Sequence, residues 1–197
     1  SAYERGDLSR VYPIARGTAP VLVLIISTLF LLDVINSMEI LGVIAIGIGI
    51  LILARGVFSH GETVTLLPYA LASAVGTAGY SIADGLGARA AGNASSYIGW
   101  LFFLDAIMFI LWGMIRRGPS VFPRKISVWV LGMAAGTASV LAYWIAVWAM
   151  TIAPIAIVSA LRETSVMFAV LIGVLFFKEK ADKGKIIASV VIVIGIL

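Results

Sequence analysis

Charged side chains inside apolar segments are the residues of this sequence most able to do chemistry. Arg16, Asp84, Asp105, Arg162 and Glu163 all interrupt runs that are otherwise hydrophobic. A charged group at the centre of a membrane costs at least ~2.5–3.5 kcal/mol on insertion scales, so it is normally paired or functional. We therefore expect these five positions to be ion pairs, substrate-binding groups or proton-binding groups.

The two arginines inside predicted spans suggest an anion site. Guanidinium groups bind carboxylates and phosphates through two parallel hydrogen bonds, so Arg16 and Arg162 can line one cavity and hold an anionic substrate. In the alternative, each arginine pairs with a carboxylate on a neighbouring helix and stabilises the bundle. A carrier can use both arrangements in turn, and the sequence leaves both open.

The acidic residues allow two readings as well. Glu163 follows Arg162 directly, so the two side chains point about 100° apart on a helix and each needs a partner elsewhere. A carboxyl group inside a membrane can bind and release protons, which makes Glu163 or Asp105 a candidate for proton coupling. Asp84 is a further candidate for coupling or for a charge pair, and a permanent ion pair is the alternative in each case.

Aromatic side chains form the third set of candidates. Ring faces can contact an apolar or cationic substrate, although helical aromatics more often pack against one another. The candidate rings for lining a cavity are those of Tyr80, Trp100, Tyr143 and Trp144. Tyr97 and Trp148 lie nearer a segment end and fit the aromatic belt at a membrane surface.

The composition places these residues in a membrane protein. Hydrophobic residues make up 61% of the 197 residues and charged residues 12%, about half the share in a soluble domain. The chain has no cysteine and a single histidine, His60, so we expect no metal and no cofactor. The basic residues lie at segment ends, which favours a lipid bilayer and a small molecule as partners and not a nucleic acid.

Apolar runs of about 20 residues predict the membrane-crossing helices, since such a helix spans roughly 30 Å. The predicted spans are Val11–Leu32, Ile40–Val57, Val64–Ala83, Ser96–Ile115, Ile126–Met150, Pro154–Phe177 and Ile186–Leu197. The fold class is therefore an all-α integral membrane protein with about seven transmembrane helices. The last span is only ~18 Å long, and Ser1–Arg10 reads like a loop, so we expect both ends to be cut.

The distribution of basic residues predicts the orientation. Successive connectors are assigned to alternate sides of the membrane. Eleven of the fourteen basic residues then fall on one side and only Arg89 on the other, while Arg16 and Arg162 lie inside spans. The side rich in arginine and lysine is normally cytoplasmic. We expect a multi-pass protein of the cell membrane (plasma or inner) with Ser1 on the cytoplasmic side.

The chain also matches itself at an offset of 146 residues. Val11–Leu51 overlays Ile157–Leu197 without gaps, which places Arg16 on Arg162 and Asp33 on Glu179. Five spans separate the starts of the two copies, and because five is odd, the copies cross the membrane in opposite directions. Inverted repeats of this kind surround the central site of many secondary transporters.

Several segments resemble EamA-type members of the drug/metabolite transporter (DMT) superfamily. The similar segments are Ala2–Pro20, Tyr80–Arg89, Ala160–Ser165 and Gly173–Glu179. The resemblance implies ten helices in two inverted five-helix repeats, of which the first three helices are missing here. Residues 1–57 would end the first repeat, and residues 64–197 would form the second, with its last helix truncated.

The expected function is that of a secondary transporter for a small metabolite or drug-like solute. We expect it to work by alternating access, to act as an exporter, and to be able to form a homodimer. The alternative is a seven-helix receptor or an intramembrane enzyme. All five lysines lie in connectors, which excludes a buried Schiff-base lysine. No His-Glu-x-x-His or Gly-x-Ser-x-Gly pattern occurs, so we expect no enzyme.

Small residues predict where helices approach closely. The candidate positions are Gly132 with Gly136, Ala45 with Gly49, and Gly76 with Gly79.

Overall fold

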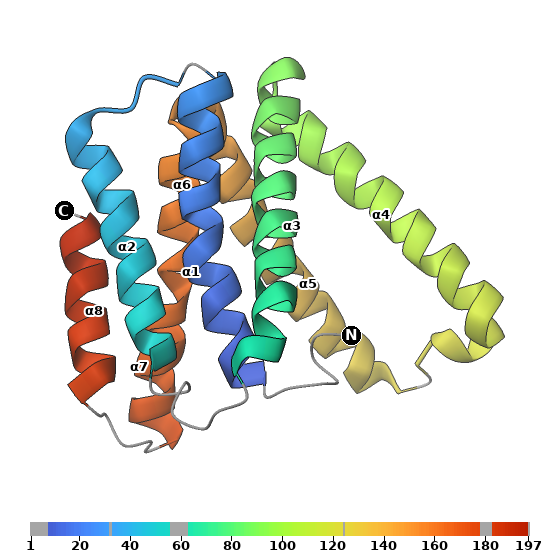
Figure 1. Ribbon diagram of the computed structural model, residues 1–197. Helices are drawn as coiled ribbons and strands as arrows, with labels where there is room; N and C mark the ends of the chain where they lie inside the picture. The colour runs from blue at the N-terminus through green and yellow to red at the C-terminus, as the bar shows by residue number, and fades with distance from the viewer. Residues whose placement is uncertain (1–7, 32, 56–62, 124, 178–182, 197) are drawn as a thin grey trace. The chain divides into compact units, whose positions relative to one another are not determined.

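The computed structural model describes residues 8–31, 33–55, 63–123, 125–177 and 183–196, and these residues form helices and short connections but no strand (Figure 1). The elements are α1 (Leu8–Ile26), the π-helical turn η2 (Ser27–Leu31), α2 (Ser37–Arg55), α3 (Thr63–Ala90), α4 (Ala94–Arg117), the 3₁₀ turn η4 (Gly118–Val121), α5 (Ile126–Ile152), α6 (Ile155–Glu163), α7 (Ser165–Phe177) and α8 (Lys183–Ile196).

The all-α class is confirmed for the described residues, and every predicted span falls on a helix. Several boundaries differ from the prediction, and the main cases are these. The predicted span Pro154–Phe177 is divided at Thr164 into α6 and α7, α3 continues to Ala90, and α8 begins at Lys183. Within the part of the chain that the structure describes, Ala94–Val121 and Ile126–Ile152 are long and apolar enough to cross a membrane. The count of seven crossings remains a prediction.

Local sequence signals explain where α4 begins and ends. Gly92 adopts a positive φ of 66° after α3, and the Asn93 side chain then accepts a hydrogen bond from the Ser96 backbone N–H at 3.2 Å. This is an N-cap, in which a side-chain oxygen satisfies one of the free N–H groups of the first turn. At the other end, Gly118 has a φ of 61° and its N–H bonds the Met114 carbonyl, which closes the helix.

The chain forms two compact units. Unit 1 consists of Ser1–Ala83 with Ala153–Leu197, and unit 2 consists of Asp84–Ile152. In unit 1, α2 packs between α1 and α8, and α1 also contacts α6 (Figure 1). The core of unit 1 is built from fully buried aliphatic side chains, among them Val23, Ile50 and Ile155.

Glycines allow α2 and α8 to approach closely. A Cβ atom at Gly42 would lie 2.7 Å from the Gly195 carbonyl oxygen. At Gly49, a Cβ would lie 2.6 Å from Cγ1 of Ile192. Real Cβ atoms do not come this near to other atoms, so only glycine fits these positions.

The contacts between α2 and α8 exchange under the 146-residue offset. Gly49 faces Ile192 and the Ala188 carbonyl, and Gly195 faces Ile46 and the Gly42 carbonyl. The offset relates these positions pairwise, as Gly49 with Gly195, Ile46 with Ile192, and Gly42 with Ala188. The interface is therefore self-complementary, as an interface across a two-fold axis is.

The other predicted glycine positions show no such contact among the residues that the structure describes. Apart from the neighbouring backbone of the same helix, no described atom lies within 4 Å of a Cβ built at Gly132, Gly136, Gly76 or Gly79. Spacing alone does not specify a contact, because the same small-residue spacing occurs here at glycines that no described side chain approaches.

Unit 2 consists of α4, η4, α5 and the last turns of α3. Its core contains Ala88, Ala94, Ile98 and Val147, with Tyr97, Phe102 and Tyr143 packed around them. Most of α4 and α5 lies outside this core, and their exposed side chains are large and apolar. Such surfaces suit contact with lipid.

Candidate functional site

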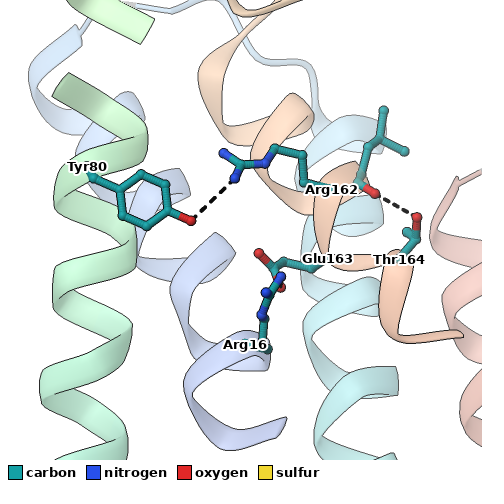
Figure 2. A network of polar contacts seen from close by, with 6 residues as sticks. Arg16, Tyr80, Arg162, Glu163 and Thr164 are labelled. Carbon is teal, nitrogen blue, oxygen red and sulfur yellow. Dashed lines mark hydrogen bonds and ion pairs between the residues drawn. The ribbon is translucent and has the colours of Figure 1, made fainter. Parts of the chain in front are cut away.

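The first cluster joins α1 and α6 in unit 1. A guanidinium nitrogen of Arg16 lies 2.9 Å from Oε2 of Glu163, forming a hydrogen-bonded ion pair between residues 147 positions apart (Figure 2). The Glu163 side chain is 2% exposed and that of Arg16 is 32% exposed. The sequence required Glu163 to find a partner on another helix, and Arg16 is that partner.

Arg162 points away from Glu163 and toward α3, as adjacent positions on a helix require (Figure 2). Its guanidinium donates a hydrogen bond to the Tyr80 hydroxyl at 3.3 Å and lies 5.6 Å from the centre of the Tyr80 ring. Tyr80 was predicted as a substrate-contacting ring, and the structure brings it next to one of the two predicted anion-binding arginines.

The ends of α6 set the positions of these two charges. Pro154 offers no side-chain cap, and Oδ2 of Asp33 accepts the Ile155 N–H at 3.3 Å instead. At the other end, the Thr164 hydroxyl donates to the Leu161 carbonyl at 2.6 Å, where α6 stops (Figure 2). Arg162 and Glu163 thus lie in the last turn, where the helix dipole favours a cation and disfavours an anion. The ion pair with Arg16 offsets the unfavourable position of Glu163.

This arrangement can bind an anion. Two guanidinium groups and one carboxylate lie in one network, and Arg162 presents several N–H donors beside a phenol hydroxyl. A carboxylate or phosphate fits such donors, because the planar guanidinium matches its geometry. Equally, an incoming anion can compete with Glu163 for Arg16, since both are acceptors of the same kind.

A second cluster lies in unit 2 around Asp84, which is 5% exposed. Its carboxylate accepts hydrogen bonds from the hydroxyl of Tyr97 at 3.1 Å and from that of Tyr143. A Cβ atom at Gly87 would lie 2.4 Å from the Tyr97 ring, so Gly87 is needed for Tyr97 to cross α3. Three helices, α3, α4 and α5, are tied together at this carboxylate.

Tyr97, predicted as a residue of the aromatic belt, has a structural role that the sequence did not reveal. Its ring is packed against the unit 2 core and its hydroxyl bonds Asp84. The missed signal was Gly87, which follows Asp84 by one helical turn and opens space beside it. Asp33, which caps α6, was also missed as a structural residue. No local pattern could reveal it, because its partner is 122 residues away.

Another contact ties α3 to the end of α5. Nε of Arg89 donates to the Met150 carbonyl at 2.8 Å. Carbonyls in the last turn of a helix lack helical partners, and a cation there complements the helix dipole. Arg89 therefore stabilises the end of α5 within unit 2.

The remaining predicted residues lie apart from these clusters. Nε1 of Trp144 donates to the Ser95 hydroxyl at 3.0 Å, and Trp100, 65% exposed, packs edge-on against Phe103 at 5.8 Å. Asp105 is exposed on α4. Within the described ranges, no group of three or more His, Cys, Asp or Glu side chains is placed to hold a metal ion.

Comparison with known proteins places the chain in a family. No curated protein and no solved structure matched it. The family model described as "EamA-like transporter family" matches residues 65–197, about two thirds of the chain. The matched part contains Tyr80, the Asp84 cluster, Arg162 and Glu163, whereas Arg16 lies outside it. The chain belongs to the EamA-like transporter family, and it is a membrane protein of the DMT superfamily.

Proposed function

We propose that this protein is a secondary transporter that exports a small solute carrying an anionic group. The observation that carries the proposal is the network in which Glu163 pairs with Arg16 while Arg162, beside it in sequence, contacts Tyr80. In the proposed site, Arg162 and Tyr80 bind the anionic group of the solute. The Arg16–Glu163 pair is the internal charge pair with which that group competes.

The internal repeat suggests how this competition is coupled to the two sides of the membrane. Arg16 and Arg162 are equivalent under the 146-residue offset, and both lie in the network that contains Glu163. In an inverted-repeat transporter, equivalent groups of the two repeats face opposite sides of the membrane in turn. We propose that residues 1–57 and 64–197 belong to two such repeats, and that the self-complementary contact of α2 with α8 joins them.

Alternating access then follows from exchange of partners. An anionic solute bound to Arg162 weakens the contact between Arg162 and Tyr80. A solute that reaches Arg16 replaces Glu163 as the partner of the Arg16 guanidinium. A proton on Glu163 would have the same effect on Arg16, since a neutral carboxyl pairs more weakly with a guanidinium. The proposed location is the plasma or inner membrane, with the Ser1 side cytoplasmic.

Flux through liposomes tests the proposal with the full-length protein. Labelled succinate and glycerol 3-phosphate, with neutral glycerol as the matched comparison, are measured in counterflow. We expect Arg162→Gln to reduce anion flux by about tenfold or more. The reason is that the variant loses one charge-assisted hydrogen bond to the solute, which is worth roughly 1.5–3 kcal/mol. Arg162→Lys should retain part of the flux, because it keeps the charge but not the planar fork.

Arg117→Gln is the matched control, because Arg117 is exposed at the end of α4. It removes the same charge and should leave flux unchanged. The proposal is overturned if Arg162→Gln transports both anions at the normal rate, or if glycerol moves as fast as glycerol 3-phosphate.

A further inference from the structure

Asp105 lies at the middle of α4, which is long and apolar enough to cross a membrane, and a carboxylate in the middle of such a span is costly. It is 11 residues from Ala94 and 12 from Arg117, or ~16–18 Å from either end of α4 by helical rise. The hydrocarbon core is roughly 30 Å thick, so this position is close to its midplane. The side chain is exposed, and no hydrogen bond or ion pair joins it to any other residue that the structure describes.

Asp105 lies at the point on one face of α4 where the side chains change from buried against unit 2 to exposed. Residues three, four and seven positions apart share a helix face. Toward the start of α4, this face holds Ile98, 3% exposed, and Phe102, whose ring packs edge-on against Tyr143 at 5.5 Å. Toward the end, it holds Phe109, 70% exposed, and Trp112, 59% exposed. The acid is thus the first residue beyond the packed part of the face.

The open part of this face is rich in aromatic and sulfur-containing side chains. The rings of Phe109 and Trp112 lie 6.4 Å apart, and Met108, 71% exposed, is next to Phe109. Aromatic faces attract cations, and Trp112 already has the Arg116 guanidinium 5.7 Å from its ring centre. A carboxylate beside such rings in a medium of low dielectric constant favours an organic cation.

We propose that the α4 face formed by Asp105, Met108, Phe109 and Trp112 binds a lipophilic monocation, such as an alkylammonium. The cationic head would pair with the Asp105 carboxylate, and the apolar part would lie along Met108 and the two rings. The pairing removes the cost of an unpaired carboxylate at the midplane. This inference goes beyond the proposed anion site of unit 1 and does not depend on it.

A second copy of the chain is a poorer occupant for this face. Two identical faces meeting across a two-fold axis bring Asp105 of each copy toward the other. Two carboxylates brought together in this way repel each other, whereas a cation satisfies each one. A lysine or arginine from a different membrane protein would satisfy the charge, and the experiment separates that case.

Chemical labelling tests the proposal on the unmodified full-length protein in nanodiscs. Dicyclohexylcarbodiimide, a hydrophobic reagent for membrane carboxyl groups, is expected to modify Asp105, as read by mass spectrometry of the peptide. Octyltrimethylammonium should slow this reaction several-fold, while octyl sulfonate and octyl glucoside, which carry the same tail, should not. Labelling of Glu39, a partly exposed acid at the start of α2, serves as the internal control.

Binding to variants completes the test. Titration calorimetry should show octyltrimethylammonium binding about tenfold weaker to Asp105→Asn, equivalent to about 1.4 kcal/mol, and near-normal binding to Asp105→Glu. Glu39→Gln, which keeps its capping contact with Asn36, should bind normally.

Three results would overturn the inference. Equal protection by octyl glucoside would mean that the face is only apolar. Unchanged binding to Asp105→Asn would mean that the carboxylate takes no part. Failure of octyltrimethylammonium to protect Asp105, together with a change of oligomeric state in Asp105→Asn, would assign the face to another protein chain.

Discussion

The Arg16–Glu163 pair is the contact whose energetics the structure defines most sharply. Breaking a buried pair by removing one partner leaves an uncompensated charge and typically costs 3–5 kcal/mol. Glu163 is buried but about a third of the Arg16 side chain is exposed, so solvent relieves part of this cost. We expect Glu163→Gln to lower the free energy of unfolding by roughly 3 kcal/mol, the lower end of that range.

The prediction is measured as the thermal unfolding midpoint of the purified protein in one detergent. The double variant Arg16→Gln with Glu163→Gln should be more stable than Glu163→Gln alone, because neither side chain is then left charged without its partner. Arg117→Gln, on an exposed position, should change stability by no more than about 0.5 kcal/mol. Strictly additive losses in the double variant would mean that the pair is not energetically coupled.

The sequence predicts the individual charged residues of the site, but it does not predict most of their contact partners. A charge inside an apolar run is visible without structure, and each of the five such residues occupies a distinct environment here. The direction of Glu163 away from Arg162 also followed from helical spacing alone. The choice of Arg16, Tyr80 and Asp33 as partners did not, because these contacts join residues 82 to 147 positions apart.

At the scale of helices, the α2–α8 interface makes a symmetrical prediction. A methyl group at Gly49 would press on Ile192, and one at Gly195 would press on Ile46, so the two substitutions are equivalent under the 146-residue offset. Overpacking of this kind costs about 1–3 kcal/mol. Gly49→Ala and Gly195→Ala should therefore lower the unfolding midpoint by similar amounts.

Gly132→Ala on α5 provides the matched control for both substitutions. Nothing that the structure describes lies within 4 Å of its Cβ, so alanine should be neutral or should stabilise the helix by up to about 1 kcal/mol. If Gly49→Ala and Gly195→Ala behave like this control, the helices do not pack in the described register. A large loss at only one of the two positions would mean that the exchanged contacts are not energetically equivalent.

Hydropathy located the helices well because it measures the long apolar runs that a bilayer requires. It missed the division at Thr164, since one residue with a hydroxyl that bonds Leu161 does not change the mean over a 20-residue window. It also ended α3 too early. The stretch after Ala83 contains Asp84 and Arg89, whose charges look like a connector until Tyr97, Tyr143 and Met150 supply their partners.

At the scale of the whole molecule, the strongest expectation is the placement of each connector on one side of the membrane. The eleven basic residues that share one set of connectors favour the cytoplasmic side. The chain has no cysteine, so single cysteines report their own position without background labelling. Suitable exposed positions are Val34 before α2, Ala91 between α3 and α4, and Ser120 in η4.

We expect a membrane-impermeant maleimide to label Val34→Cys and Ala91→Cys on intact cells, and to label Ser120→Cys only after permeabilisation. Ala91 and Ser120 lie at opposite ends of α4, whose 24 residues extend ~36 Å and exceed the hydrocarbon thickness. Labelling of both from outside would mean that α4 does not cross. The reverse pattern would place Ser1 outside, and would require the basic connectors to overcome the bias that normally keeps them in the cytoplasm. Accessibility of Val34 together with Ala91 further requires an even number of crossings between them, so it would contradict any arrangement in which only one of α2 and α3 spans the membrane.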